Sequence, residues 1–146
     1  MSATNAFETA LLTLYFNNTD HANIGDAGGL QNSATAGSFY VSLHTADPGE
    51  AGNQTTSEAT YTSYARVAVA RSGAGWTISG ANVSNAAAIT FPACTGGSNT
   101  ITHFGIGSDV SGTGNLFFKG ALGASLAVSS GITPSFAIGE LDVNAD

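Results

Sequence analysis

Two stretches decide the fold: FYVSLHTADPGEAG at residues 39–52 and YTSYARVAVAR at residues 61–71. In the first stretch apolar residues alternate with residues that carry a polar group. This period of two predicts a strand with one face on a core. The two sets are Phe39, Val41 and Leu43 against Tyr40, Ser42 and His44. Asp47, Pro48 and Gly49 then predict a tight turn. The second stretch predicts another strand and carries two of the chain's three basic residues.

Shorter apolar runs bounded by turn residues continue to the end of the chain. They predict strands at residues 76–78, 88–91, 101–106, 115–118, 126–129 and 136–143. Glycine or proline punctuates them about every 8–12 residues, the spacing of antiparallel sheets. We therefore expect a mainly β fold, an antiparallel β-sandwich or β-barrel with one short N-terminal α-helix.

The helix is predicted at residues 6–16. Phe7, Leu11, Leu14 and Tyr15 fall on one side of it, because their spacings follow the helical period. Asn5 is the expected N-cap, and residues 17–18 the expected stop. The apolar stripe suits either a helix packed on its own domain or a helix donated to a neighbouring subunit.

The length of 146 residues suits a single domain, 1–146. We divide it into the helical segment 1–18, an irregular connection at 19–37 rich in Gly, Ala and Asn, and a β domain at 38–146. Trp76 is expected to anchor a core, in preference to stacking on a sugar. Cys94, the single cysteine, is expected to be a small buried thiol.

Composition excludes several classes of protein. Charged residues make up 9% of the chain, against roughly 25% in a typical domain. The net charge of −7, with three basic residues, leaves no basic patch for nucleic acid. No apolar run is long enough to span a membrane, and no secretion signal is visible, so we expect synthesis in a cytoplasm. A surface this poor in charge favours close contact with neighbours.

A search for chemistry finds no catalytic residue, cofactor-binding motif or metal site to assign. The nucleophile-elbow and phosphate-loop patterns are absent. His44, Asp47 and Glu50 lie close in sequence and could hold a divalent ion, but Asp47 suits a turn that bonds its own backbone better. His103 is expected to be a hydrogen-bonded histidine on a sheet. We therefore expect no enzyme and no small-molecule substrate.

Arg66 is the polar residue that stands out. With so few cations in the chain, we expect its guanidinium to stack on an aromatic ring such as Tyr64 or to clamp a carboxylate with two hydrogen bonds. The sequence leaves open whether the partner belongs to the same subunit or to a neighbour. Arg66 and Tyr64, with the helix residues Phe7, Leu11, Leu14 and Tyr15, form the predicted interaction set.

Six motifs in a fixed order carry a resemblance to a known group of proteins. They are YVSLHTADPGE, YTSYARVAV, the lone Trp76, VSNAAAITFP, ITHFGIG and SGTGNLFFKGAL. In this order they resemble small virion structural proteins of tailed bacteriophages, described as tail-fibre-like, minor structural or head-decoration proteins. The resemblance covers residues 39–143 and implies a mostly β virion component that is present in many copies and catalyses nothing.

This resemblance leads to the expected function. We expect a capsid decoration, or cement, protein on the outer surface of the head, made in the host bacterial cytoplasm and bridging capsomers. Its partners would be the major capsid protein and further copies of itself, in a homo-oligomer such as a trimer. The helix and the loop at residues 25–37 are the expected contact regions. The alternative is a tail, collar or baseplate component, or a fibre-like module that binds a glycan on the host surface. A third candidate, a hydrolase of the bacterial envelope, lacks an identifiable catalytic pair.

Overall fold

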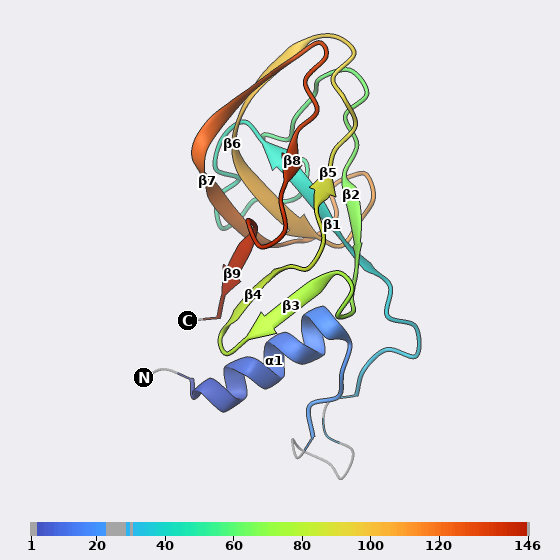
Figure 1. Ribbon diagram of the computed structural model, residues 1–146, viewed down its shortest axis with the longest axis vertical. Helices are drawn as coiled ribbons and strands as arrows, with labels where there is room; N and C mark the ends of the chain where they lie inside the picture. The colour runs from blue at the N-terminus through green and yellow to red at the C-terminus, as the bar shows by residue number, and fades with distance from the viewer. Residues whose placement is uncertain (1–2, 23–28, 30, 146) are drawn as a thin grey trace. The chain divides into compact units, whose positions relative to one another are not determined.

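The computed structural model describes residues 3–22, 29 and 31–145, and it shows a mainly β protein with one N-terminal helix (Figure 1). The helix α1 spans Asn5–Asn17. The strands are β1 (Ser38–His44), β2 (Val67–Ala70), β3 (Trp76–Ser79), β4 (Asn82–Asn85), β5 (Ile89–Thr90), β6 (Ser98–Gly107), β7 (Leu116–Ser129), β8 (Ser135–Phe136) and β9 (Asp142–Asn144). The predicted fold class is confirmed in its sandwich-like form, since no sheet of the described residues closes into a barrel.

The chain groups into two compact units, each assembled from separate segments. The first comprises the described residues of Met1–Ser38, Ala70–Ala88 and Phe136–Asp146, and the second comprises Phe39–Val69 and Ile89–Ser135. The expectation of one domain stays a prediction. The predicted contact loop at residues 25–37 falls partly outside the described residues, at 25–28 and 30.

In the first unit, α1 begins one residue earlier than predicted. Thr4 is the N-cap, and its hydroxyl accepts a hydrogen bond from the N–H of Phe7 at 3.4 Å, so the assignment of Asn5 as the cap is wrong. A threonine oxygen, like that of asparagine, can accept from one of the otherwise unpaired N–H groups of a first turn. The predicted stop is confirmed, because Asn18 is the C-cap and takes the left-handed conformation with φ of 52°.

Helix α1 packs on the sheet β3–β4–β9 through a different side than the predicted stripe. Leu12 and Phe16 are its buried residues, and the Phe16 ring meets the Trp76 ring edge-on with centroids 4.9 Å apart. Trp76 is fully buried, so its predicted role as a core anchor is confirmed. Phe7 and Leu11 are exposed, so the first of the two alternatives, a stripe packed on the helix's own domain, does not hold for these two residues.

Asn85 at the end of β4 organises the rest of this sheet. It is buried, donates to the carbonyls of Ala87 and Ala137, and accepts from the N–H of Leu141 at 2.9 Å. Strand β4 was not predicted, because its sequence NVSN contains a single apolar residue. The run 136–143, predicted as one strand, contains two short ones, β8 and β9. They are separated by a turn at Gly139, which has φ of 76°.

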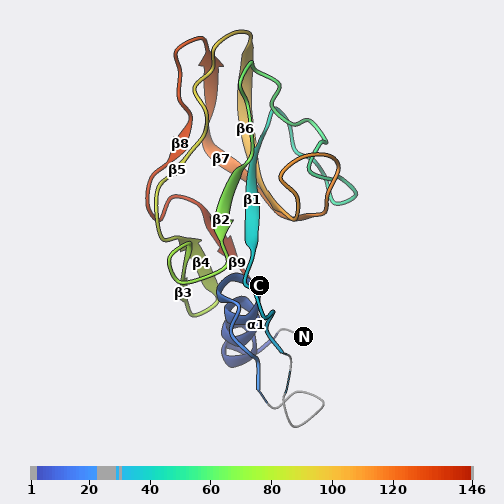
Figure 2. The same cartoon turned by 90° about the vertical axis from the view of Figure 1, so that its right-hand side faces the viewer.

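In the second unit, four antiparallel strands form a sheet in the order β2–β1–β6–β7; β2, β1 and β6 are also seen in Figure 2. On one face of the sheet the apolar residues Val41 and Leu43 pair with Ile106 and Phe104 of β6. On the other face, Ser42 and His44 are also fully buried, although the alternation predicted an open face there. The carbonyl of Thr56 bonds His44 on this second face, and β1 is buried on both faces over residues 41–44.

Strand β7 is one long edge strand, where the sequence predicted two short ones. Its pairing with β6 shifts between Ile101, opposite Leu126, and His103, opposite Ala121. Residues 122–125 therefore bulge outward opposite Thr102 alone. Glycines between residues 118 and 126 predicted the end of one strand and the start of another. In the structure Gly120 lies within the strand against the Phe104 ring, where a Cβ would approach to 2.5 Å, so the position has no room for a larger residue.

Candidate functional site

Arg66 forms the most extensive polar cluster of the second unit. The residue lies just before β2 and is buried. Its Nε donates to Oε1 of Glu58 at 2.7 Å and its Nη2 donates to Oε2 of Glu58 at 2.8 Å. The predicted two-bond clamp on a carboxylate is confirmed, and the partner belongs to the same chain.

The same guanidinium also holds the loop at residues 108–114. Nη1 of Arg66 donates to the carbonyl of Asp109 at 2.9 Å, and Nη2 donates to the carbonyl of Gly112 at 2.7 Å. Gln54, which is fully buried, bonds both the N–H and the carbonyl of Asp109. These bonds come from the buried side of the exposed loop 108–114 and fix its backbone. Charge-assisted bonds to carbonyls are strong where water is excluded.

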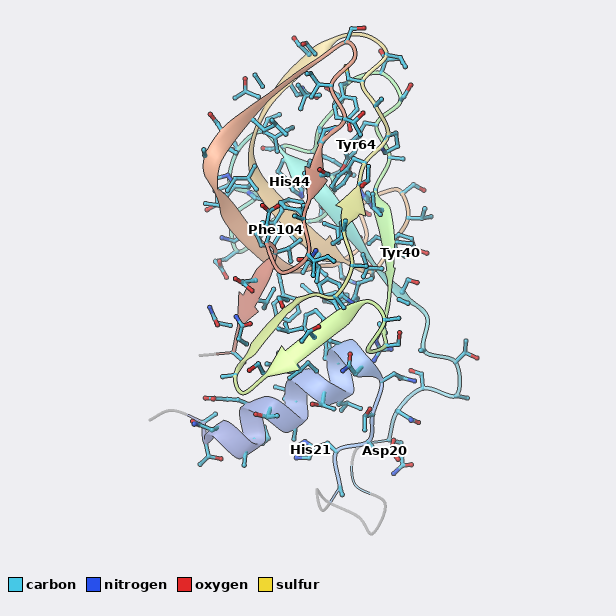
Figure 3. The ribbon with its side chains drawn as sticks, in the orientation of Figure 1. Asp20, His21, Tyr40, His44, Tyr64 and Phe104 are labelled. Atoms are coloured by element: carbon cyan, nitrogen blue, oxygen red, sulfur yellow. The ribbon has the colours of Figure 1, made fainter. Side chains whose placement is uncertain are left out.

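Tyr64, which is labelled in Figure 3, completes this cluster. Its hydroxyl donates to Oε1 of Glu58 and accepts from the N–H of Leu43, each at 3.0 Å. Its ring stacks with Phe91, centroids 6.4 Å apart. Burial raises the pKa of the Tyr64 phenol far above its usual range, so the group stays neutral. Sequence reasoning found Arg66 and Tyr64 but missed Glu58 and Gln54, whose surroundings in the sequence carry no periodic signal.

His44 lies at the end of β1 in the interior of the second unit (Figure 3). Its Nδ1 donates to the carbonyl of Thr56 at 2.8 Å, which leaves Nε2 to accept from the hydroxyl of Ser42, also at 2.8 Å. Desolvation by burial is the largest cause that lowers the pKa of His44. A bonded serine and histidine can act as nucleophile and base, but both side chains are fully buried and the base is oriented by a carbonyl.

His44, Asp47 and Glu50, the candidate metal ligands of the sequence, do not share a site in the structure. Both nitrogens of His44 are engaged, while Asp47 and Glu50 bind Lys119 at 3.0 and 3.2 Å on the surface. Asp47 also accepts from the N–H of Gly49 at 2.9 Å, as expected of a turn residue. Across the described part of the chain, no group of three His, Cys, Asp or Glu side chains could hold a metal ion.

Arg71 plays a similar part at the end of α1 in the first unit. Its Nε donates to the carbonyl of Tyr15 at 2.7 Å, and its two Nη atoms donate to the carbonyls of Leu14 and Ala36, each at 3.1 Å. A cation at a helix C-terminus stabilises the helix dipole. All three basic side chains of the protein thus bind acceptors of their own chain.

The predicted interaction residues therefore fall into two sets. Arg66 and Tyr64 share one carboxylate inside the second unit. Of the helix residues in the first unit, Phe7 and Leu11 are exposed, while Leu14 and Tyr15 are half-buried. Among the described residues, the other large apolar side chains that are exposed lie on β7 and in loops: Val110, Phe117, Leu126, Ile132 and Ile138. Cys94 is buried, as predicted.

These features define a β-rich fold in which the polar side chains described above hold the backbone. The chain belongs to the family of the podophage GP4 fiber I protein gp80, which matches it over residues 2–144. It is therefore a small, fibre-like structural protein of a phage virion, and the resemblance found in the sequence is confirmed. No curated protein matches the chain. Among the described residues, no helix is long and apolar enough to cross a membrane.

Proposed function

We propose that the protein is a non-catalytic subunit of a virion fibre, which joins other virion proteins through its surface. One observation carries the proposal: three side chains of the second unit that could do chemistry are bonded to groups of the same unit. Arg66, His44 and Tyr64 all have internal partners. The family's description as a fiber protein supports the same assignment.

The exterior that remains suits adhesion between proteins. Its exposed apolar side chains are distributed over α1, β7 and loops of both units, and few charges surround them. Contacts of this kind are individually weak, but several made at once hold a subunit firmly through effective concentration. The partners proposed are neighbouring virion proteins and further copies of this chain.

The position of the protein on intact particles tests this proposal. Antibodies raised against the purified chain and labelled with gold are expected to mark fibres in electron micrographs of whole phage. Separated heads and tails from the same preparation show which part retains the label. Labelling of neither part would contradict a virion role altogether.

A capsid decoration protein is the second candidate, and the charge distribution favours it. Arg66, Arg71 and Lys119 are engaged within the chain, so the exposed charges are mostly acidic and suit the outside of a shell filled with nucleic acid. Stoichiometric binding of the purified protein to heads that lack tails, with label spread over the head lattice, would select this candidate over the fibre.

The absence of catalysis is tested separately. Asp47 and Glu50 are the surface carboxylates that follow His44 in the sequence. A phage that carries Asp47→Asn with Glu50→Gln is expected to assemble and infect like the wild type. Selective loss of envelope-degrading activity with normal assembly would instead establish a hydrolase.

A further inference from the structure

Helix α1 has apolar residues on two opposite sides. One side packs on a sheet, whereas the other side, where the Phe7 ring meets the His21 ring with centroids 5.7 Å apart, is partly exposed in the part of the chain that the structure describes. Leu12 and Phe16 face the sheet of the first unit and are 3% and 0% exposed. On the other side, Phe7 is 45% exposed and Leu11 is 39% exposed. A helix that is apolar on all sides is normally buried on all sides. The outer side of α1 therefore has the composition of an interface.

The spacing on this outer side points to the kind of partner. Phe7, Leu11 and Leu14 are separated by four and then three residues, which are the d, a and d positions of a heptad. Leu12 and Phe16 then occupy the b and f positions, on the far side of the helix. We name Phe7, Leu11 and Leu14 the outer seam. A seam with this spacing accepts the side chains of another helix.

A second copy of the chain is the occupant that fits, because it carries the same seam without a charged residue. Two molecules that each carry a net charge of −7 repel one another, so they approach most easily where neither presents an acid. The outer seam contains no charged residue, and Glu8 is the only charged residue in α1. When two α1 helices meet along their seams, Glu8 of one copy does not face an acid of the other copy's seam.

We propose that copies of this protein associate through the outer seam of α1, helix against helix. The inference deepens the proposed function, on which its purpose in the virion rests, by naming the partner and the surface. Two helical turns bury less area than a standard stable interface, so the association of purified chains is concentration-dependent. In the virion it acts together with the other contacts of each subunit.

The test compares two matched substitutions in the full-length protein by sedimentation velocity over a range of concentrations. Leu11→Glu places a charge in the seam and is expected to weaken association about tenfold or more, from the lost burial of one leucine. Leu126→Glu is the control, because Leu126 is 36% exposed on β7 in the other unit and undergoes the same change. Leu11→Ala keeps helix propensity and should weaken association without unfolding α1, as circular dichroism verifies.

Disulfide trapping gives an independent readout. Leu11→Cys is expected to form a dimer across the seam on mild oxidation, whereas Leu126→Cys is not; the native Cys94 is buried in both. A wild-type protein that stays monomeric at every concentration, or equal effects of the substitutions at Leu11 and Leu126, would overturn the inference. Either result would leave the proposed function standing, since that is judged by the position of the label on particles.

Discussion

Arg66→Ala is a substitution for which the structure predicts a large loss of stability. It removes two bonds to Glu58 and two to the loop carbonyls of Asp109 and Gly112. The Glu58 carboxylate, 15% exposed in its side chain, is left without its cation. Breaking a buried ion pair by deleting one partner costs about 3–5 kcal/mol, a large share of the roughly 5–15 kcal/mol that stabilises a typical domain.

Lys119→Ala provides the matched control for this prediction. It also deletes a cation that binds two acceptors, Asp47 and Glu50, but Glu50 is 95% exposed in its side chain. An exposed ion pair contributes little to stability, because water screens its charges. The difference between the two variants therefore isolates the effect of burial.

Urea denaturation followed by circular dichroism measures the free energy of unfolding of both variants. Hydrogen exchange then measures the loop at residues 108–114. Its amides should exchange faster in Arg66→Ala than in the wild type, and at the wild-type rate in Lys119→Ala. If Arg66→Ala fails to fold, Glu58→Gln serves as the milder probe, since it keeps the shape of the side chain and removes only its charge. Losses of equal size at Arg66 and Lys119 would refute the assignment of the buried pair as a main source of stability.

Three further predictions follow from local geometry. Gly105→Ala should cost about 1–3 kcal/mol of stability by overpacking, because the added Cβ would lie 2.7 Å from Nε2 of His44. In the control Gly123→Ala the added Cβ meets nothing within 4 Å. The control should be neutral or stabilising in the same urea titration. His44 has a lowered pKa in the folded protein, so its contribution to stability is complete above the unfolded pKa of about 6.5 and is lost as the pH falls below that value. The urea midpoint of the wild type should therefore drop between pH 7.5 and pH 5.5, and it should drop less steeply with pH in His44→Gln. Equal pH dependence of the two midpoints would count against this prediction. Arg71→Ala should lose about 2 kcal/mol from its charged bonds at the end of α1, and Arg71→Lys should recover part of that loss, as thermal unfolding would show.

The sequence predicted those elements whose pattern is local. Strand β1 was found because Phe39, Val41 and Leu43 alternate over an apolar core, and α1 was found because its period and its stop at Asn18 are both local signals. The short strand β4 was missed, since its stability comes from bonds of Asn85 to residues about 50 positions away. Propensity carries no information about such partners.

The candidate site was predictable in its chemistry but not in its partners. The scarcity of cations singled out Arg66, and the two-bond geometry followed from the shape of a guanidinium. The carboxylate of Glu58 and the amide of Gln54 reach this cluster from a loop whose path depends on the tertiary fold. The same loop encloses Ser42 and His44, which explains why simple alternation predicted an open face there.

The bulge at residues 122–125 affects how the protein behaves when many copies are made together. A long strand at the edge of a sheet is a template on which further strands stack without limit, as in amyloid. Where β7 bulges, its backbone no longer offers a continuous row of donors and acceptors, and Lys119 adds a charge beside the break. The bulge therefore disfavours unlimited edge-to-edge pairing of newly made chains along their longest strand. Association of unassembled subunits is then left to surfaces that form closed oligomers.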